Sequence, residues 1–361
     1  MPRAALAATI ALLLGACDVD SDKIDLKPVS FAELPGWEED DHAAAFRALL
    51  KSCHADPELP YCAAAILLGD GVSEAAARSF FEDLYTPHRI EGGGTQGLVT
   101  AYYEPEVRGS REKTGAFQVP VYGKPDDLVT IITETERARF NDRITGFRDT
   151  PEGRVPYYTR AEIWGGALEG RGLELLYLDD PVELFYMQVQ GSGVVRLPDG
   201  SRVRLTYAGK NGHPYTSIGK LLVERGAIAK GAANMEAVKA WLHADPSRAR
   251  ALMEENRSYV FFSELEASAP LGAEGVPLTT GRSLAVDAAY HRLGLPIFVA
   301  APDVKGEDGR PFRRLMIAQD VGSAIRGPER GDIFFGTGEA AGALAGGVAH
   351  AARFYVLLPK R

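Results

Sequence analysis

Apolar residues recur along this chain at two different spacings, which predict different secondary structure. Segment 41–53 has apolar positions at helical spacing, and a second such run starts after Ser73 and ends before Pro87. Further helices are predicted at 216–225, 235–243 and 246–256. Short apolar or alternating runs bounded by Gly, Pro and Asp predict strands at 98–103, 117–122, 173–178, 185–189 and 203–207.

Two further features of the sequence also predict β structure. The sequence Leu-Pro-Asp-Gly at 197–200 indicates a hairpin. A second β region is predicted from residue 259 onward. The fold class predicted from the pattern is therefore mainly β with accessory helices.

The first residues have the pattern of an export signal. Arg3 precedes an apolar run at 4–16, which is too short to cross a bilayer but fits the apolar part of a signal peptide. The run ends at Cys17 in a Leu-Gly-Ala-Cys sequence that resembles a bacterial lipobox, which predicts lipidation of Cys17. A plain secretory signal is the alternative. We expect a signal peptide at 1–17 and a tether at 18–40.

Charge and cysteine content narrow the possible functions. The net charge of -9 argues against a general binder of nucleic acid, because phosphate backbones require a positive surface. The 361 residues are enough for two domains. In an oxidising exported compartment, Cys53 and Cys62 are predicted to form a disulfide. No metal site is expected, because the seven histidines are scattered and form no ligand-spaced cluster.

Two aspartates stand at the ends of predicted buried strands. Asp320 follows the apolar segment 315–318 and Asp332 precedes the segment 333–335, with a glycine-rich connection between them. We expect both carboxylates to lie near each other at one mouth of a barrel, where paired carboxylates favour acid/base chemistry. The alternative is that both aspartates cap turns.

Five segments together resemble one family, the membrane-bound lytic murein transglycosylase A family. They lie, in the family's order, at 100–111, 157–163, 186–200, 207–222 and 319–338. The C-terminal part also resembles the three-aspartate module, with Asp287 as its first aspartate. The resemblance covers roughly residues 95–361.

The resemblance implies a discontinuous fold. A double-psi β-barrel domain is expected from 41–107 and 259–361, with the three-aspartate module at about 275–361. A β-rich domain at 108–258 is expected as an insertion, with the substrate groove between the two domains. Members of the family are lipoproteins on the periplasmic side of the cell envelope, so we expect a lipid anchor, an outer-membrane location, and other cell-wall enzymes as partners.

The resemblance also implies the reaction. The family cleaves the β-1,4 bond between N-acetylmuramic acid and N-acetylglucosamine in peptidoglycan glycan strands, without water and without a cofactor, and leaves 1,6-anhydromuramic ends. On the family's pattern Asp332 is the acid/base, although the PERG segment before it is one residue longer than expected. Asp320 is expected to raise the pKa of Asp332 by like-charge repulsion. Asp287 is expected either near the substrate or in a structural role.

Sugar-binding residues are expected on the inserted domain and on the 98–103 strand. The candidates are Tyr102, Tyr103, Gln188, Gln190, Ser192, Lys210, Asn211 and Tyr215. Gln188 and Gln190 would share one face of the predicted 185–189 strand, and a solvated sheet face is the alternative. Turn chemistry and helix capping are the alternative for 210–217. Two other functions stay open, a non-catalytic expansin-like glycan-binding module and a hydrolytic muramidase.

Overall fold

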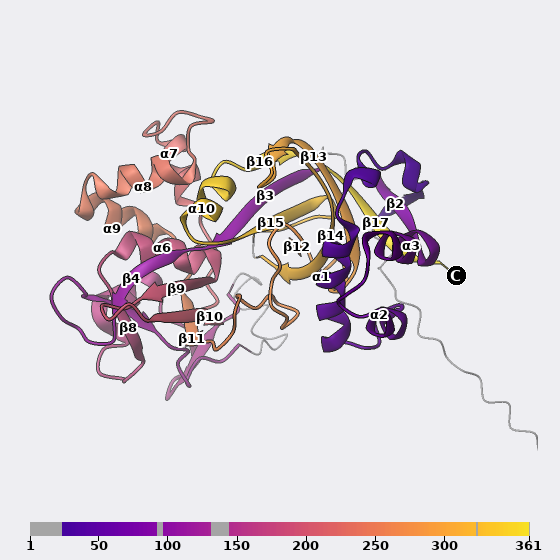
Figure 1. The fold of residues 1–361 in the computed structure, drawn as a ribbon. Coiled ribbons are helices and arrows are strands. Elements are labelled where there is room, and N and C mark those ends of the chain that lie inside the picture. The colour runs from indigo at the N-terminus through magenta and orange to yellow at the C-terminus, as the bar shows by residue number, and fades with distance from the viewer. Residues whose placement is uncertain (1–23, 92–96, 131–143, 323, 361) are drawn as a thin grey trace, which may run out of the picture.

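The computed structural model describes residues 24–91, 97–130, 144–322 and 324–360. A nine-stranded sheet and a six-stranded sheet organise these residues into two units (Figure 1). The six-stranded sheet and its helices lie within 106–264, between two parts of the chain that build the nine-stranded sheet. The protein is therefore mainly β, with one unit inserted into the other.

The nine-stranded sheet combines residues from both ends of the chain. Its strands, in sheet order, are β1 (Asp25–Pro28), β2 (Tyr85–Glu91), β17 (Arg353–Pro359), β13 (Pro296–Lys305), β14 (Pro311–Val321), β12 (Ser283–Val286), β15 (Arg330–Thr337), β3 (Leu98–Glu104) and β16 (Ala349–Ala351). Its helices are η1 (Phe31–Glu33), η2 (Trp37–Glu39), α1 (His42–Ala55), α2 (Cys62–Leu68), α3 (Glu74–Leu84) and α10 (Glu339–Ala345). Helices α1 to α3 lie together on one side of this unit (Figure 1).

The first helices begin where the sequence predicts. Asp41 caps α1 by accepting a hydrogen bond from the Ala44 amide, and Ser73 caps α3 by accepting one from the Ala76 amide. The apolar face of α1 packs on the sheet, and Phe46 and Leu49 share a buried cluster with Leu315 of β14. Helix α1 therefore packs against β14, the strand that carries Asp320.

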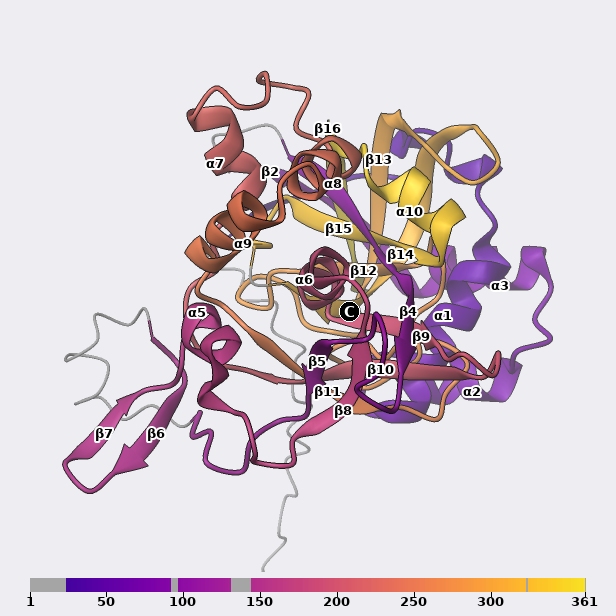
Figure 2. The same cartoon turned by 90° about the vertical axis from the view of Figure 1, so that its left-hand side faces the viewer.

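The six-stranded sheet has the order β11 (Val260–Glu264), β10 (Arg202–Lys210), β9 (Ser192–Arg196), β4 (Glu106–Ser110), β8 (Glu174–Leu178) and β5 (Val119–Tyr122). Its unit also contains β6 (Phe147–Thr150), β7 (Gly153–Pro156), α5 (Arg160–Glu162), η3 (Ile163–Ala167), α6 (Pro181–Gln190), α7 (Ile218–Glu224), α8 (Met235–His243) and α9 (Pro246–Glu255). The predicted hairpin at 197–200 joins β9 to β10, which pair antiparallel. Figure 2 shows α6 to α9 gathered beside the strands of this unit.

Two predictions from the sequence are wrong. Segment 185–189 is not a strand but part of α6, which Asp180 caps and Pro181 begins. Most of its apolar residues are buried, and a short apolar run does not distinguish a buried helix from a buried strand. Segment 24–40 is not a tether either, because β1 pairs with β2 and Trp37 is buried in the core.

The described residues contain no membrane-spanning helix, and the predicted lipid anchor lies outside them. Among the described residues, no helix combines the length and apolar character needed to cross a bilayer. Cys17 and the predicted signal peptide lie outside the described residues.

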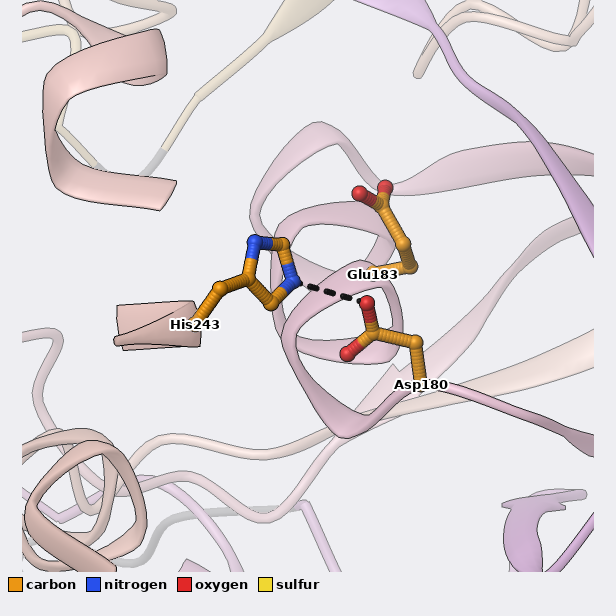
Figure 3. A group of neighbouring side chains, drawn as sticks. All are labelled: Asp180, Glu183 and His243. Atoms are coloured by element: carbon orange, nitrogen blue, oxygen red, sulfur yellow. Dashed lines mark hydrogen bonds and ion pairs between the residues drawn. The ribbon is translucent and has the colours of Figure 1, made fainter. Parts of the chain in front are cut away.

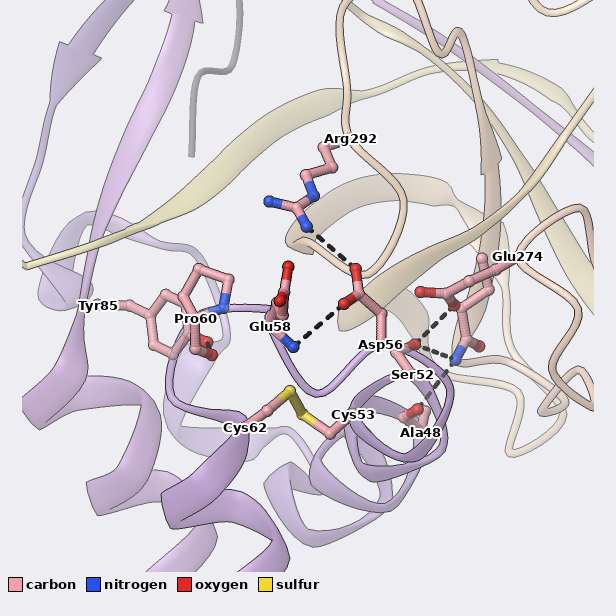
Figure 4. The surroundings of a disulfide bond; sticks show 11 residues. Ala48, Ser52, Cys53, Asp56, Glu58, Pro60, Cys62, Tyr85, Glu274 and Arg292 are labelled. Carbon is pink, nitrogen blue, oxygen red and sulfur yellow. Dashed lines mark hydrogen bonds and ion pairs between the residues drawn. A yellow bond between two sulfur atoms is a disulfide. The ribbon is translucent and has the colours of Figure 1, made fainter. Parts of the chain in front are cut away.

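The predicted disulfide is confirmed. Cys53 of α1 is bonded to Cys62 at the start of α2, and their Cα atoms are 5.0 Å apart (Figure 4). We expect the Cys53→Ala/Cys62→Ala variant to lose about 2–3 kcal/mol of unfolding free energy, because its unfolded state lacks the cross-link and has more chain entropy. Urea denaturation measures this loss. A reductant should lower the stability of the wild type and leave the variant unchanged, and equal responses would contradict the prediction.

Candidate active site

The two candidate aspartates lie on either side of one residue of β12. Ala285 is the register partner of Asp320 on β14, which runs parallel, and of Asp332 on β15, which runs antiparallel. Each interstrand step is about 4.8 Å, so the two Cα positions are separated by about 10 Å. The aspartates therefore lie near each other, as predicted, but β12 from elsewhere in the chain separates their strands.

Asp332 belongs to a short polar chain. The Arg330 guanidinium donates to the Thr100 hydroxyl at 2.8 Å, and that hydroxyl donates to Asp332 Oδ1. Burial raises the pKa of Asp332 to about 6, with the negative charge of Asp320 adding to it, while the Thr100 hydrogen bond and the Arg330 charge act in the opposite direction. A carboxyl group with this pKa exchanges its proton close to neutral pH.

Asp320 has a different environment. Its Oδ2 accepts a hydrogen bond from the Tyr102 hydroxyl at 2.8 Å, and its Oδ1 accepts from the amides of Ala273 and Val321, each at 2.9 Å. Burial raises the pKa of Asp320 above its ordinary value, and these three hydrogen bonds offset part of that rise. Three donors favour the ionised form, so Asp320 is suited to remain the negative member of the pair.

Thr100 and Arg330 were not predicted from the sequence. β3 presents Thr100, Tyr102 and Glu104 on one side, since side chains alternate along a strand. Thr100 contacts Asp332, and Tyr102 contacts Asp320. The alternation of side chains along this strand could have placed Thr100 on the same side as Tyr102. Arg330 carries no comparable signal in the sequence.

Tyr102 and Tyr103 point to opposite faces of the sheet, because side chains alternate along β3. Tyr103 is buried, and its hydroxyl lies 3.7 Å from the Met235 sulfur. Asp287, at the end of β12, is also buried and accepts hydrogen bonds from the Ala289 and Gly327 amides. Through these contacts Asp287 stabilises the loop that leads to β15, which is a structural role.

The two glutamines do not share a strand face, because they lie on α6. The buried Gln188 amide accepts from Arg160 at 2.6 Å and donates to the Val260 carbonyl at 3.0 Å, so both its polar atoms contact the protein. Gln190 at the end of α6 accepts from the Tyr103 amide at 3.0 Å and so links the two units. The pairing expected for N-acetyl recognition is therefore absent from these two residues.

The other candidates fall into two groups. Ser192 is buried in β9, and Asn211 is fully buried with its side chain bonded to the backbone of Tyr158, Arg257 and Tyr259. Tyr215 is exposed, and Lys210 is half-buried, with its pKa lowered by burial and by the charge of Arg326. Only Lys210 and Tyr215 of these four offer polar groups at the surface.

One group of side chains in the described residues has the composition of a metal site. Potential ligand atoms of Asp180 and Glu183 at the start of α6 and of His243 at the end of α8 lie within 4.8 Å of one another, and His243 faces Asp180 (Figure 3). Asp180 caps α6 and pairs with His243 at 2.8 Å, while both oxygens of Glu183 lie 2.8 Å from the Lys239 ammonium. Each carboxyl group therefore already has a hydrogen-bonding partner on α8, so the cluster is better explained as a contact between the two helices.

The fold and the carboxyl pair define the class: a mainly β, two-unit protein with a site suited to acid/base catalysis. Residues 98–263 match the MltA specific insert domain and residues 282–358 match the 3D domain. Membrane-bound lytic murein transglycosylase A of Vibrio cholerae is 35% identical over 276 residues, covering 74% of this chain and 68% of that protein. The Escherichia coli protein of that name is 36% identical over 277 residues, with the same coverage.

Solved structures agree. The membrane-bound lytic murein transglycosylase of Agrobacterium tumefaciens has a TM-score of 0.85 and 38% identity, covering 93% of this chain and 98% of that one. MltA of Neisseria gonorrhoeae has a TM-score of 0.80 and 35% identity, covering 92% of both chains. E. coli MltA with bound chitohexaose has a TM-score of 0.70 and 28% identity, covering 94% of both chains. This chain belongs to the MltA family of lytic murein transglycosylases.

Proposed function

We propose that this protein is a lytic transglycosylase that cleaves the bond between N-acetylmuramic acid and N-acetylglucosamine in peptidoglycan and leaves 1,6-anhydromuramic ends. The observation that supports this most directly is the Asp332 carboxyl group, whose pKa is about 6, beside an Asp320 held by three hydrogen bonds. The relatives named as lytic murein transglycosylases add independent support.

A single acid/base can perform both halves of the reaction. Protonated Asp332 donates to the leaving glycosidic oxygen, and the resulting carboxylate takes the proton of the muramic C6 hydroxyl as that oxygen bonds to C1. Because the nucleophile belongs to the substrate, no second carboxylate is needed to activate water, in contrast to an inverting glycosidase. Asp320 supports the first step, since its negative charge helps Asp332 to keep its proton.

We further propose that the nine-stranded sheet contains a double-psi β-barrel and that the glycan strand lies in a groove between the two units. The barrel would comprise 41–107 and 259–361, and the insertion 108–258, except that β1 belongs to the nine-stranded sheet and that β4 and β11 pair within the inserted unit. The E. coli structure with bound chitohexaose supports a sugar-binding groove in this family. Lys210, Tyr215 and Gln190 are the candidates for lining it from the inserted unit, and Tyr102 from the other.

The proposal extends to the cell envelope. Lipidation of Cys17 would anchor the enzyme on the periplasmic side, in the outer membrane, beside its polymeric substrate and other cell-wall enzymes. The lipobox-like sequence and the relatives named as membrane-bound support this placement.

The mass of the product tests the proposed function. Purified peptidoglycan treated with the protein should release disaccharide peptides that are one water lighter than hydrolytic products, as measured by mass spectrometry. Products of hydrolytic mass would identify a muramidase instead. Absence of any product, with binding retained, would identify a glycan-binding module.

A further inference from the structure

A hydrogen-bonded chain connects helix α1 to the turn beside Asp320. The Ser52 hydroxyl of α1 donates to Glu274 Oε2 at 2.7 Å and accepts from the Gln319 side-chain amide at 2.9 Å. Ser52 and Gln319 are fully buried, whereas Glu274 is half-buried. Figure 4 shows Ser52 and Glu274 facing each other next to the disulfide.

The turn that carries Glu274 is seated directly on β14. The Glu274 amide donates to the Gln319 carbonyl at 3.2 Å, and the neighbouring Ala273 amide donates to Asp320 Oδ1 at 2.9 Å. A Cβ atom at Gly272 would lie 2.2 Å from the Gln319 carbonyl oxygen, so only glycine permits this approach. Gln319 and Asp320 are consecutive, which places the Ser52 contacts one residue away from the carboxyl pair.

We propose that Glu274 is a positioning residue for Asp320: its carboxyl group ties the 272–275 turn to α1, so that the Ala273 amide remains on the Asp320 carboxylate. This inference rests on the proposed function, in which the charge of Asp320 assists Asp332. Neither Glu274 nor Ser52 touches the reacting atoms in this scheme.

The surroundings of Glu274 favour the protonated, uncharged form of its carboxyl group. Burial raises the pKa of Glu274 to about 7, the Ser52 hydrogen bond lowers it, and the nearby Asp56 raises it. Asp56 at the end of α1 is itself 3.0 Å from the Arg292 guanidinium, and Lys51 of α1 is directed to the Pro277 carbonyl and the Thr279 hydroxyl. Among the described residues no ion pair joins Glu274 to a cation, so the hydrogen bond from Ser52 is the contact that holds its carboxyl group.

Loss of the hydrogen bond between Ser52 and Glu274 should change the pKa values of Asp320 and Asp332 in opposite directions. If the Ala273 amide leaves Asp320, the Asp320 carboxylate keeps two of its three donors and its pKa rises. A less ionised Asp320 exerts less repulsion on Asp332, whose pKa then falls. The alkaline limb of the activity profile, where Asp332 loses its proton, should therefore move to lower pH.

The test compares the pH profile of anhydromuropeptide release in Glu274→Ala, Glu274→Gln and the control Glu307→Ala. Glu307 is an exposed glutamate of the same unit, and its carboxylate is paired with Arg314. We expect the alkaline limb of Glu274→Ala to move down by about half a pH unit or more. Glu274→Gln should restore the profile, because its amide oxygen still accepts from Ser52, and the control should match the wild type.

Several outcomes would overturn the proposal. One is a Glu274→Ala variant with lower thermal stability but an unmoved limb, and another is an equal shift in Glu274→Gln. Should Glu274→Ala fail to fold, Ser52→Ala removes the same contact and must show the same shift. The wild-type product mass tests the proposed function separately, and ¹³C NMR titration of aspartate carboxyl groups reports the Asp320 pKa in these variants whether or not product forms.

Discussion

Asp332→Asn is expected to lower the rate of anhydromuropeptide release by about 10²- to 10⁴-fold, the usual contribution of a general acid/base. Asparagine keeps the shape of the side chain and its contact with Thr100, but it neither donates a proton to the glycosidic oxygen nor accepts one from the C6 hydroxyl. Product release measured by liquid chromatography and mass spectrometry checks the loss. Binding of glycan strands should persist.

Asp320→Asn is the matched control for that experiment, because it removes the other carboxylate of the pair. It should retain measurable turnover. Without the negative charge of Asp320 the pKa of Asp332 falls below about 6, so activity should be lost at a lower pH than in the wild type. An inactive Asp320→Asn together with an active Asp332→Asn would reverse the two roles.

The free energy of unfolding, measured as a function of pH, distinguishes loss of the catalytic group in Asp332→Asn from loss of the fold. The pKa of Asp332 in the folded protein is raised to about 6 from its ordinary value of 3.8. The folded state therefore binds this proton more tightly than the unfolded state, and stability declines as pH rises from about 4 to 6. Asparagine has no proton to lose, so Asp332→Asn should be at least as stable as the wild type at pH 7.

Glu104→Ala is expected to reduce the free energy of unfolding by about 3 kcal/mol, because it removes a fully buried carboxylate and leaves the largely covered Arg204 guanidinium without its ion-pair partner. Glu104 is fully buried at the end of β3, and its oxygens lie 3.0 and 3.2 Å from Nε of Arg204 on β10. It also accepts from the Thr337 hydroxyl of β15 at 2.7 Å. These contacts join the nine-stranded sheet to the six-stranded sheet, where β3 leads into β4 (Figure 1).

Glu106→Ala is the control for that variant. Glu106 lies two residues further along, and its ion pairs with Arg196 and Arg202 are longer, at 3.7 and 3.5 Å, to more exposed arginines. Its loss should cost less than about 1 kcal/mol. Urea denaturation gives both values, and equal losses in the two variants would show that Glu104 does not join the units as described.

Local features of this protein were predictable from the sequence because they depend on neighbouring residues. Asp41 and Ser73 cap helices through hydrogen bonds to amides three residues away, and the Leu197 to Gly200 turn forms a hairpin from its own backbone preferences. The Cys53–Cys62 bridge spans a short separation. The two aspartates were identified by their positions at the ends of apolar runs, and the family by five motifs together.

The tertiary structure decided what depends on contacts far apart in the chain. Segment 185–189 is helical because its apolar residues pack on two sides, Met187 in the cluster of the six-stranded sheet and Phe185 and Tyr186 in the cluster formed with α7 and α9. The acid/base environment of Asp332 required Thr100, which is 232 residues away, and the neighbours of Asp320 come from β3 and from the Ala273 turn. Sequence spacing carries no record of such pairings, since strand register between β3, β12, β14 and β15 is set by the packing of the whole sheet.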